Sequence, residues 1–187
     1  MNKSSIYTVC LLTLLIALVG AGCRRKGVKL QAEAVTDRAA MPVLDGTEVT
    51  TLISDSGITR YRIHTRKWQI YDRAEPSYWE FPEGIYLEKF NEDLEVAASL
   101  QSDYAYYDER AQIWRLSGNV HAMNTEGEQF DTPELNWNQN TERIYSDSVI
   151  KITRESSIIE GVGFNSNQTL TEYTILHPTG LFPIEDD

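Results

Sequence analysis

The sequence predicts an all-β protein, and three observations support this. Polar clusters typical of turns recur at intervals of 11–17 residues through the stretch from Leu94 to Ile175, beginning at Asn91, Asp108, Asn124, Asn138, Arg154 and Asn165. Between the clusters apolar and polar residues alternate, as where Trp114 and Leu116 flank Arg115. Helical periodicity is almost absent from the body of the chain. These short antiparallel strands share one apolar face, so the sheet must close or fold over to hide it.

Composition limits the chain to one folded domain and excludes several classes of partner. With 187 residues and 41% hydrophobic content it can bury one good core. The formal net charge of −11 argues against nucleic acid as a partner and against general attraction to anionic membrane surfaces. The only cysteines are Cys10 and Cys23. The folded body therefore contains no disulfide and no thiolate metal site.

Residues 1–23 form a targeting segment, with Lys3 ahead of an apolar run and small residues before Cys23. Gly20-Ala21-Gly22-Cys23 resembles a bacterial lipobox, in which Cys23 is lipidated after cleavage. The alternatives are an uncleaved membrane helix and an ordinary cleaved signal; against the helix, Arg24, Arg25 and Lys26 lie on the side that would cross the membrane. Residues 24–43 then form a flexible tether, 44–183 the β domain and 184–187 an acidic tail.

Two hairpins begin the β domain. One joins 47–53 to 58–70 around Ser54-Asp55-Ser56-Gly57, and the other joins 84–90 to 94–100. A period of two places Tyr61 and Ile63 on the apolar face, and three arginines with His64 on the other. Between the hairpins, 72–82 carries two prolines and reads as a loop or sheet corner.

The same one-sidedness continues to the end of the domain. Leu94, Val96, Ala98 and Leu100 share a face and predict a half-buried strand from Leu94 onward. Glycines and a proline interrupt the later strands where a sheet could kink and fold over; they are Gly118, Pro133, Gly161 and Gly163. Periodicity alone does not distinguish a filled sandwich from an open groove.

No catalytic or metal-binding constellation is recognisable. The histidines His64, His121 and His177 lie far apart and lack a second ligand at helical spacing. There is no nucleophile motif and no glycine-rich phosphate loop. Chance pairs are expected among 28 carboxylates, so they carry no signal. We therefore expect no enzyme activity and no cofactor.

Five segments, taken in order, resemble the LptC family, the periplasmic bridge components of lipopolysaccharide export. They are Ser54–Tyr61, Trp79–Ile85, Leu116–Val120, Thr132–Trp137 and Gly161–Asn167. The resemblance covers about 44–180. It implies a twisted antiparallel β-jelly-roll, open along one side, as in the related OstA and LptA proteins, whose apolar interior shields the acyl chains of lipopolysaccharide.

The resemblance also implies partners and a place in the cell. The chain would stand on the periplasmic face of the inner membrane of a Gram-negative bacterium, anchored by its N-terminus. It would accept lipopolysaccharide from an LptBFG-like ABC transporter and pass it to an LptA-like bridge protein by edge-to-edge sheet pairing. Many relatives keep an uncleaved membrane helix, whereas this chain has a near-lipobox at Cys23.

The resemblance makes apolar residues the candidates for the groove. Arg60, Arg62 and Arg66 are possible phosphate contacts. Two other readings remain open, a structural or adhesive envelope lipoprotein with a closed β-core and a carbohydrate-active enzyme with two carboxylates in one cleft. The groove candidates are Tyr61, Ile63, Leu94, Val96, Leu100, Trp114, Leu116, Val120, Leu135, Trp137, Ile150, Ile152 and Phe164.

Overall fold

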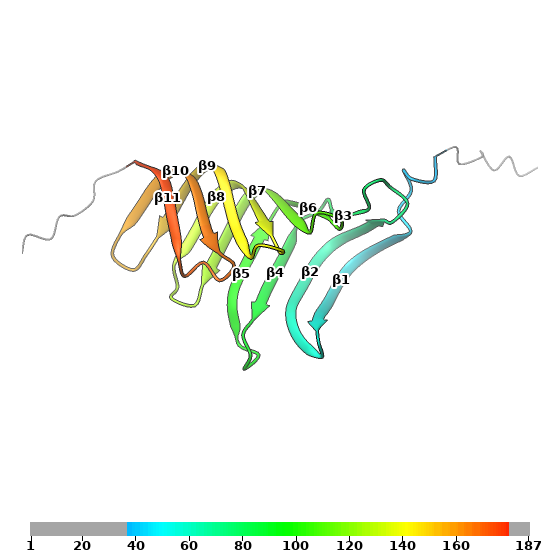
Figure 1. Cartoon of the computed structure of the whole chain (residues 1–187), viewed down its shortest axis with the longest axis horizontal. Coiled ribbons are helices and arrows are strands. Elements are labelled where there is room, and N and C mark those ends of the chain that lie inside the picture. The colour runs from blue at the N-terminus through cyan, green and yellow to red at the C-terminus, as the bar shows by residue number, and fades with distance from the viewer. Residues whose placement is uncertain (1–36, 180–187) are drawn as a thin grey trace, which may run out of the picture. The chain divides into compact units, whose positions relative to one another are not determined.

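A computed structural model describes residues 37–179 of the chain (Figure 1). The targeting segment with Cys23, most of the predicted tether and the acidic tail lie outside the described residues. Every regular element in 37–179 is a strand, and the described part contains no helix that could cross a membrane. The strands are β1 (Leu44–Asp55), β2 (Ile58–Tyr71), β3 (Tyr78–Phe81), β4 (Ile85–Phe90), β5 (Val96–Ser102), β6 (Tyr104–Asp108), β7 (Ile113–Asn124), β8 (Gln129–Asn138), β9 (Arg143–Thr153), β10 (Ile158–Asn167) and β11 (Tyr173–Thr179).

The strands form one antiparallel meander, as the all-β prediction requires. β3 with β4, and β5 with β6, behave as two long strands that are each interrupted once: β2 pairs with both β3 and β4, and β7 with both β5 and β6. Each long strand therefore pairs with the next along the chain. The predicted hairpin turn at Ser56-Gly57 is confirmed, and both residues have positive φ (52° and 82°), as a two-residue hairpin turn requires.

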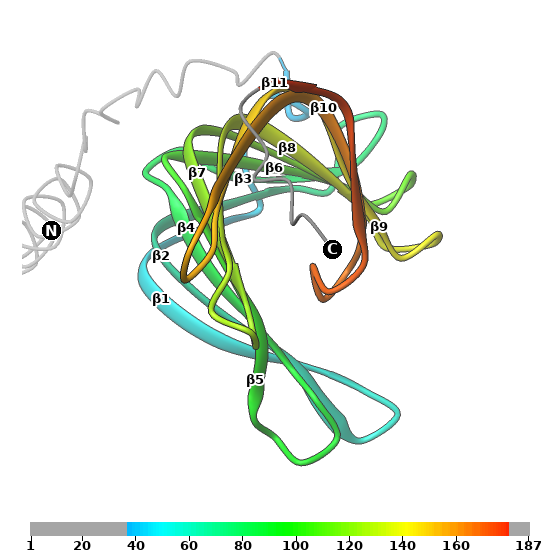
Figure 2. The same ribbon diagram turned by 90° about the vertical axis from the view of Figure 1, so that its left-hand side faces the viewer.

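The meander bends along a seam that crosses nearly every strand. Register shifts lie at Gly118–Asn119 in β7, around Pro133 in β8 and at Gly163 in β10, confirming three of the predicted break points. Gly118 and Gly163 have positive φ (74° and 81°), which glycine adopts without steric cost. On one side of this seam lie β4 and β5, and on the other β3 and β6, so the sheet has two walls facing each other (Figure 2).

Buried hydroxyl groups stabilise the bends. Ser102 and Thr132 each donate to the carbonyl oxygen two residues ahead, at Tyr104 and Glu134 (2.9 and 3.0 Å), and the Thr65 hydroxyl lies between the carbonyl oxygens of Gly84 (2.7 Å) and Lys67 (2.9 Å). Ser146 donates to the same Glu134 carbonyl across the strand pair at 2.7 Å. All four hydroxyl residues are buried. Because a bend removes carbonyls from the strand ladder, these side chains replace the lost hydrogen bonds.

Aromatic side chains fill much of the space between the walls. Trp114 lies at the centre, stacked on Phe81 and Tyr107 with ring centroids 5.5 and 4.7 Å apart. A second cluster joins Phe130 to Phe164 and Tyr173. Aromatic pairs in such arrangements bury large apolar areas. The Trp114 cluster packs along the wall of β3 and β6, and the Phe130 cluster joins the two walls.

Two predictions about the hairpins need correction. The segment 72–82 is not wholly a loop, because β3 lies within it and brings Trp79 against Trp68. The predicted burial of Leu94 and Val96 is wrong, since their side chains are 59% and 41% exposed. Leu94 belongs to the turn before β5. Ala97 is an extra residue opposite the Lys89–Phe90 step, and such a bulge turns Val96 to the outer face.

Candidate functional site

A small apolar cavity lies between the two walls. It has a volume of about 30 Å³, which is room for about one or two water molecules. β4 and β5 form one side, and β8, β9 and the turn after β10 form the other. Its lining is apolar apart from Lys89, Ser99 and Gln168. The lining residues are Leu87, Lys89, Ala98, Ser99, Leu100, Trp137, Ile144, Gln168 and Leu170.

Most of the predicted groove residues lie between the walls, but they pack against one another. Tyr61 is half-buried and contacts this core. Only Leu100 and Trp137 of the predicted set line the cavity. The interior in this conformation is therefore filled for most of its length. Ten of the predicted residues are at most 8% exposed: Ile63, Leu100, Trp114, Leu116, Val120, Leu135, Trp137, Ile150, Ile152 and Phe164.

Sequence reasoning missed the other lining residues for two reasons. Leu87 and Ile144 alternate with polar neighbours and could have been found by periodicity. Gln168 and Leu170 lie in the turn between β10 and β11, where no period exists. Their position in the interior depends on how that turn folds back over the sheet.

Tyr61 reaches across from one wall to two residues that line the cavity on the other, Trp137 and Gln168. Its ring lies 5.3 Å from that of Trp137, and its hydroxyl lies 3.5 Å from Oε1 of Gln168. Burial is the main reason that the pKa of the Tyr61 hydroxyl is raised above its ordinary value. The hydroxyl therefore remains protonated at neutral pH. The contact is one ring pair and a long hydrogen bond, which are weak restraints on wall separation.

A polar latch joins the walls beyond this contact. We use this name for Asn124, Glu128, Arg154 and Tyr173. Glu128 is buried; its carboxylate forms an ion pair with Arg154 (Nε to Oε1, 2.6 Å) and accepts hydrogen bonds from Asn124 Nδ2 at 2.8 Å and the Tyr173 hydroxyl at 3.1 Å. Arg154 Nε also donates to the Tyr173 hydroxyl at 3.0 Å. Because the first three residues lie on one wall and Tyr173 on the other, the latch must break if the walls separate here.

Leu170 enters the interior from the turn between β10 and β11. Its side chain is 1% exposed, although its backbone has a φ of 60°, an uncommon conformation for a bulky residue. Asn124 Nδ2 donates to its carbonyl oxygen at 3.0 Å. The turn therefore fixes the Leu170 side chain against the cavity, and its backbone is locally strained.

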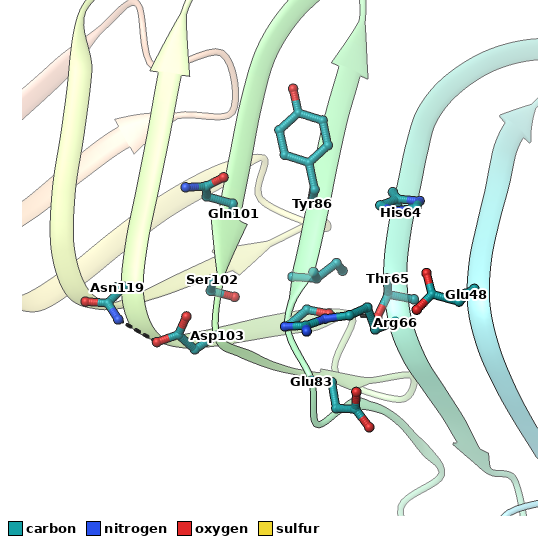
Figure 3. A pocket seen from close by; sticks show the side chains of 12 residues that line it. Glu48, His64, Thr65, Arg66, Glu83, Tyr86, Gln101, Ser102, Asp103 and Asn119 are labelled. Carbon is teal, nitrogen blue, oxygen red and sulfur yellow. Dashed lines mark hydrogen bonds between the residues drawn. The ribbon is translucent and has the colours of Figure 1, made fainter.

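The three arginines proposed for phosphate contacts lie on or near the outer face. Arg62 forms an ion pair with Glu88, and Arg60 precedes the inward-facing Tyr61. Arg66 lines an open hollow of about 850 Å³ with His64 and three carboxylate residues (Figure 3). The carboxylates there are those of Glu48, Glu83 and Asp103. Any phosphate contact made by Arg62 or Arg66 would therefore be outside the interior.

Other chemistry finds little support in this part of the chain. Among residues 37–179 no group of three or more His, Cys, Asp or Glu side chains is placed to hold a metal ion. Nδ1 of His121 lies 2.7 Å from a carboxylate oxygen of Asp131 on the partly exposed outer face, where one polar contact has little energetic effect. The interior is therefore the candidate site.

A comparison with protein-family models decides the family. The model described as "Lipopolysaccharide-assembly, LptC-related" matches residues 9–179, nearly the whole chain. The chain belongs to the LptC-related family. Membership gives it a role in lipopolysaccharide transport and assembly in the cell envelope, and LptC proteins are components of a transport bridge rather than enzymes. No curated protein matches the chain.

Proposed function

We propose that this LptC-related protein is a lipopolysaccharide carrier that shelters acyl chains between its two walls. It accepts the lipid from an inner-membrane ABC transporter and passes it to the next periplasmic bridge protein. The observation that carries this proposal is the apolar cavity bounded by Leu87, Leu100 and Leu170. Its walls are joined by few polar contacts, and it is lined almost entirely by apolar groups. No bond is made or broken in this function.

The cavity is too small for an acyl chain, so cargo entry requires the walls to separate. Burying apolar surface is worth about 25 cal/mol per Å², so a lipid with several acyl chains can supply the energy for that opening. The weak Tyr61 contact is the first to yield, whereas the latch at Glu128 and the Phe130 cluster hold one end closed. The proposed motion therefore opens the middle of the interior first.

The free edges of the sheet support handover by strand pairing. Within residues 37–179, β1 pairs only with β2 and β11 only with β10, so each leaves one edge without a partner. Unpaired strand edges accept strands of other chains through main-chain hydrogen bonds. We propose that these two edges join the chain to its neighbours, which would align their interiors. The N-terminal segment would tether the domain at the inner membrane.

The filled interior favours a second candidate. If the packing of Ile63, Trp114 and Leu135 never loosens, the chain is a structural envelope protein with a closed β-core. Such a protein carries no lipid. The two candidates therefore differ in what is bound to the purified protein.

Lipid analysis of the purified full chain tests the proposal. We expect lipopolysaccharide to copurify after extraction in mild detergent and to be quantified by mass spectrometry. A Leu100→Gln variant should retain severalfold less, because a polar group on the cavity wall disfavours an acyl chain. A Gln101→Asn variant on the outer face is the matched control. Absence of lipopolysaccharide from wild-type protein that binds none when it is added would favour the structural candidate.

A further inference from the structure

Lys89 is a cation on the inner face of the sheet. It continues the row of Ile85 and Leu87 along β4, and both of these are buried. Its side chain lines the apolar cavity, and Nζ lies 5.3 Å from the ring centroid of Tyr61. Because β4 ends at Phe90, Lys89 is close to the free end of its wall, where the two walls diverge (Figure 2).

Lys89 has no anionic partner in the described part of the chain. Four other cations of this part do: Arg62, Lys67, Arg110 and Arg154 each pair with a carboxylate. No ion pair or hydrogen bond of the described residues includes the Lys89 ammonium. Other lysines and arginines of the described part also form no ion pair, but Lys89 differs from them because its side chain lines the apolar cavity.

The surroundings of Lys89 disfavour its charge in the free protein. Burial is the main cause, and it lowers the pKa of the ammonium; the charge of Arg60 acts in the same direction and that of Glu142 opposes both. A bound anion would relieve this penalty. Its attraction to the ammonium is stronger beside an apolar cavity than in water, because the local dielectric constant is lower.

A second polar group of the cavity also lacks a partner. Trp137 lines the cavity and is 6% exposed, and its indole N–H has no acceptor among the described residues. Buried donors are usually satisfied, so an unpaired one is a place where a ligand oxygen can bind. This N–H is inaccessible in the closed conformation, so it would become a second donor beside Lys89 only when the walls separate.

We propose that Lys89 binds a phosphate group of the acylated lipid at the mouth of the interior while an acyl chain enters the adjoining cavity. This inference rests on the proposed carrier function and specifies which lipid group is recognised. Lysine suits phosphate as a compact point charge with three donors. The outer arginines do not substitute for it, because Arg62 pairs with Glu88 and Arg66 lies among carboxylates on the other face. The lipid must therefore carry both an anionic group and an acyl chain.

Binding measurements on the full chain test this proposal. The variants are Lys89→Met, which keeps the length but removes the charge, and Lys89→Arg, which keeps the charge. Lys151→Met is the matched control, because Lys151 is exposed on the outer face beside Glu160. The probes are lipopolysaccharide, the same lipopolysaccharide after enzymatic removal of its phosphates, and inorganic phosphate as a competitor.

We expect Lys89→Met to raise the Kd for lipopolysaccharide by about tenfold, the effect of losing one charge-assisted contact. Lys89→Arg and Lys151→Met should stay within about threefold of the wild type. Dephosphorylated lipid should bind equally weakly to wild type and Lys89→Met. The melting temperature of Lys89→Met should not fall, so lost binding cannot be attributed to unfolding.

The outcomes separate the two levels of the proposal. The role of Lys89 is refuted, and the carrier function stands, if wild type and Lys89→Met bind lipopolysaccharide equally. The same holds if Lys89→Met weakens the binding of dephosphorylated lipid as much as it weakens the binding of lipopolysaccharide. If inorganic phosphate at the concentration of the lipid displaces it, the site is one for free phosphate and the proposal fails. If the wild type binds no lipopolysaccharide, the carrier function itself fails.

Discussion

Replacing Leu170 by glycine should destabilise the protein less than replacing it by alanine. This reverses the order usual at buried positions. Leu170 is 1% exposed and its φ is 60°, so the substitution affects both packing and backbone strain. The two variants lose nearly the same side chain but differ in their tolerance of that backbone conformation.

The magnitudes follow from these two features. Removing a buried leucine side chain lowers the free energy of unfolding by about 3 kcal/mol. Leu170 already borders a cavity, so we expect its neighbours to relax little into the space that it leaves. Alanine keeps the left-handed strain, worth about 1–2 kcal/mol, and glycine releases it. The greater unfolded-state entropy of glycine offsets part of that gain. The free energy of unfolding of Leu170→Gly should therefore exceed that of Leu170→Ala by about 0.5–1 kcal/mol.

Thermal denaturation of the full chain and its variants measures this difference. Leu170→Ala should lower the melting temperature by about 6–12 °C, and Leu170→Gly by less. Leu116 is the matched control, because it is 2% exposed in β7 and is not among the residues with positive φ. There alanine should be the less harmful replacement. If alanine is also better at Leu170, the backbone strain at this turn is absent and the reasoning is refuted.

Three further predictions concern the latch, the pairing of β10 with β11, and Lys89. In a double-mutant cycle, Glu128→Gln and Arg154→Met should show a coupling free energy of about 1 kcal/mol, since they form an ion pair in which Glu128 is buried and the Arg154 side chain is 42% exposed; additive effects would show that the two do not interact. Gly161→Ala should cost about 2 kcal/mol or more in unfolding free energy, because its Cβ would lie 2.3 Å from the Ile175 side chain and 2.7 Å from a backbone oxygen; an unchanged denaturation midpoint would contradict this contact. Lys89→Met should stabilise the free protein at neutral pH by up to about 0.5 kcal/mol. The pKa of Lys89 is lowered in the folded state, so its charge is a penalty below that pKa, and denaturation series should show the advantage of methionine shrinking as the pH rises towards the ordinary lysine value of about 10.4.

The sequence predicted the fold well where side chains alternate within a strand. Trp114, Leu116 and Val120 were placed on the apolar face, and they are buried between the walls. The break at Gly118 was also predicted, since glycine there allows the positive φ of a bend. A period of two is a local property, so it can be read without knowing which strands pair.

Features that depend on pairing could not be predicted in the same way. The bulge opposite Lys89 turned Val96 to the outer face, and nothing in the sequence from Leu94 to Leu100 marks it. β3 was hidden by its neighbouring prolines. These errors arise because the register between paired strands depends on residues far apart in the sequence, and alternation within one strand carries no information about it.

The candidate site was the least predictable part. Leu170 reaches the interior through a folded turn, and Lys89 breaks the apolar pattern of β4 at the position that we propose is functional. A charged residue on an apolar face reads as an interruption of the strand when only the sequence is known. The proposed role of Lys89 rests on the cavity beside it and on the absence of an ion-pair partner among the described residues.

Photo-crosslinking in cells tests most directly whether lipopolysaccharide passes between the walls. A photoreactive amino acid at Leu100 lies on the cavity wall, and one at the neighbouring Gln101 points to the outer face. We predict that the Leu100 position captures lipopolysaccharide and that the Gln101 position does not. Capture of lipopolysaccharide at Gln101 but not at Leu100, in protein of normal abundance, would contradict passage through the interior.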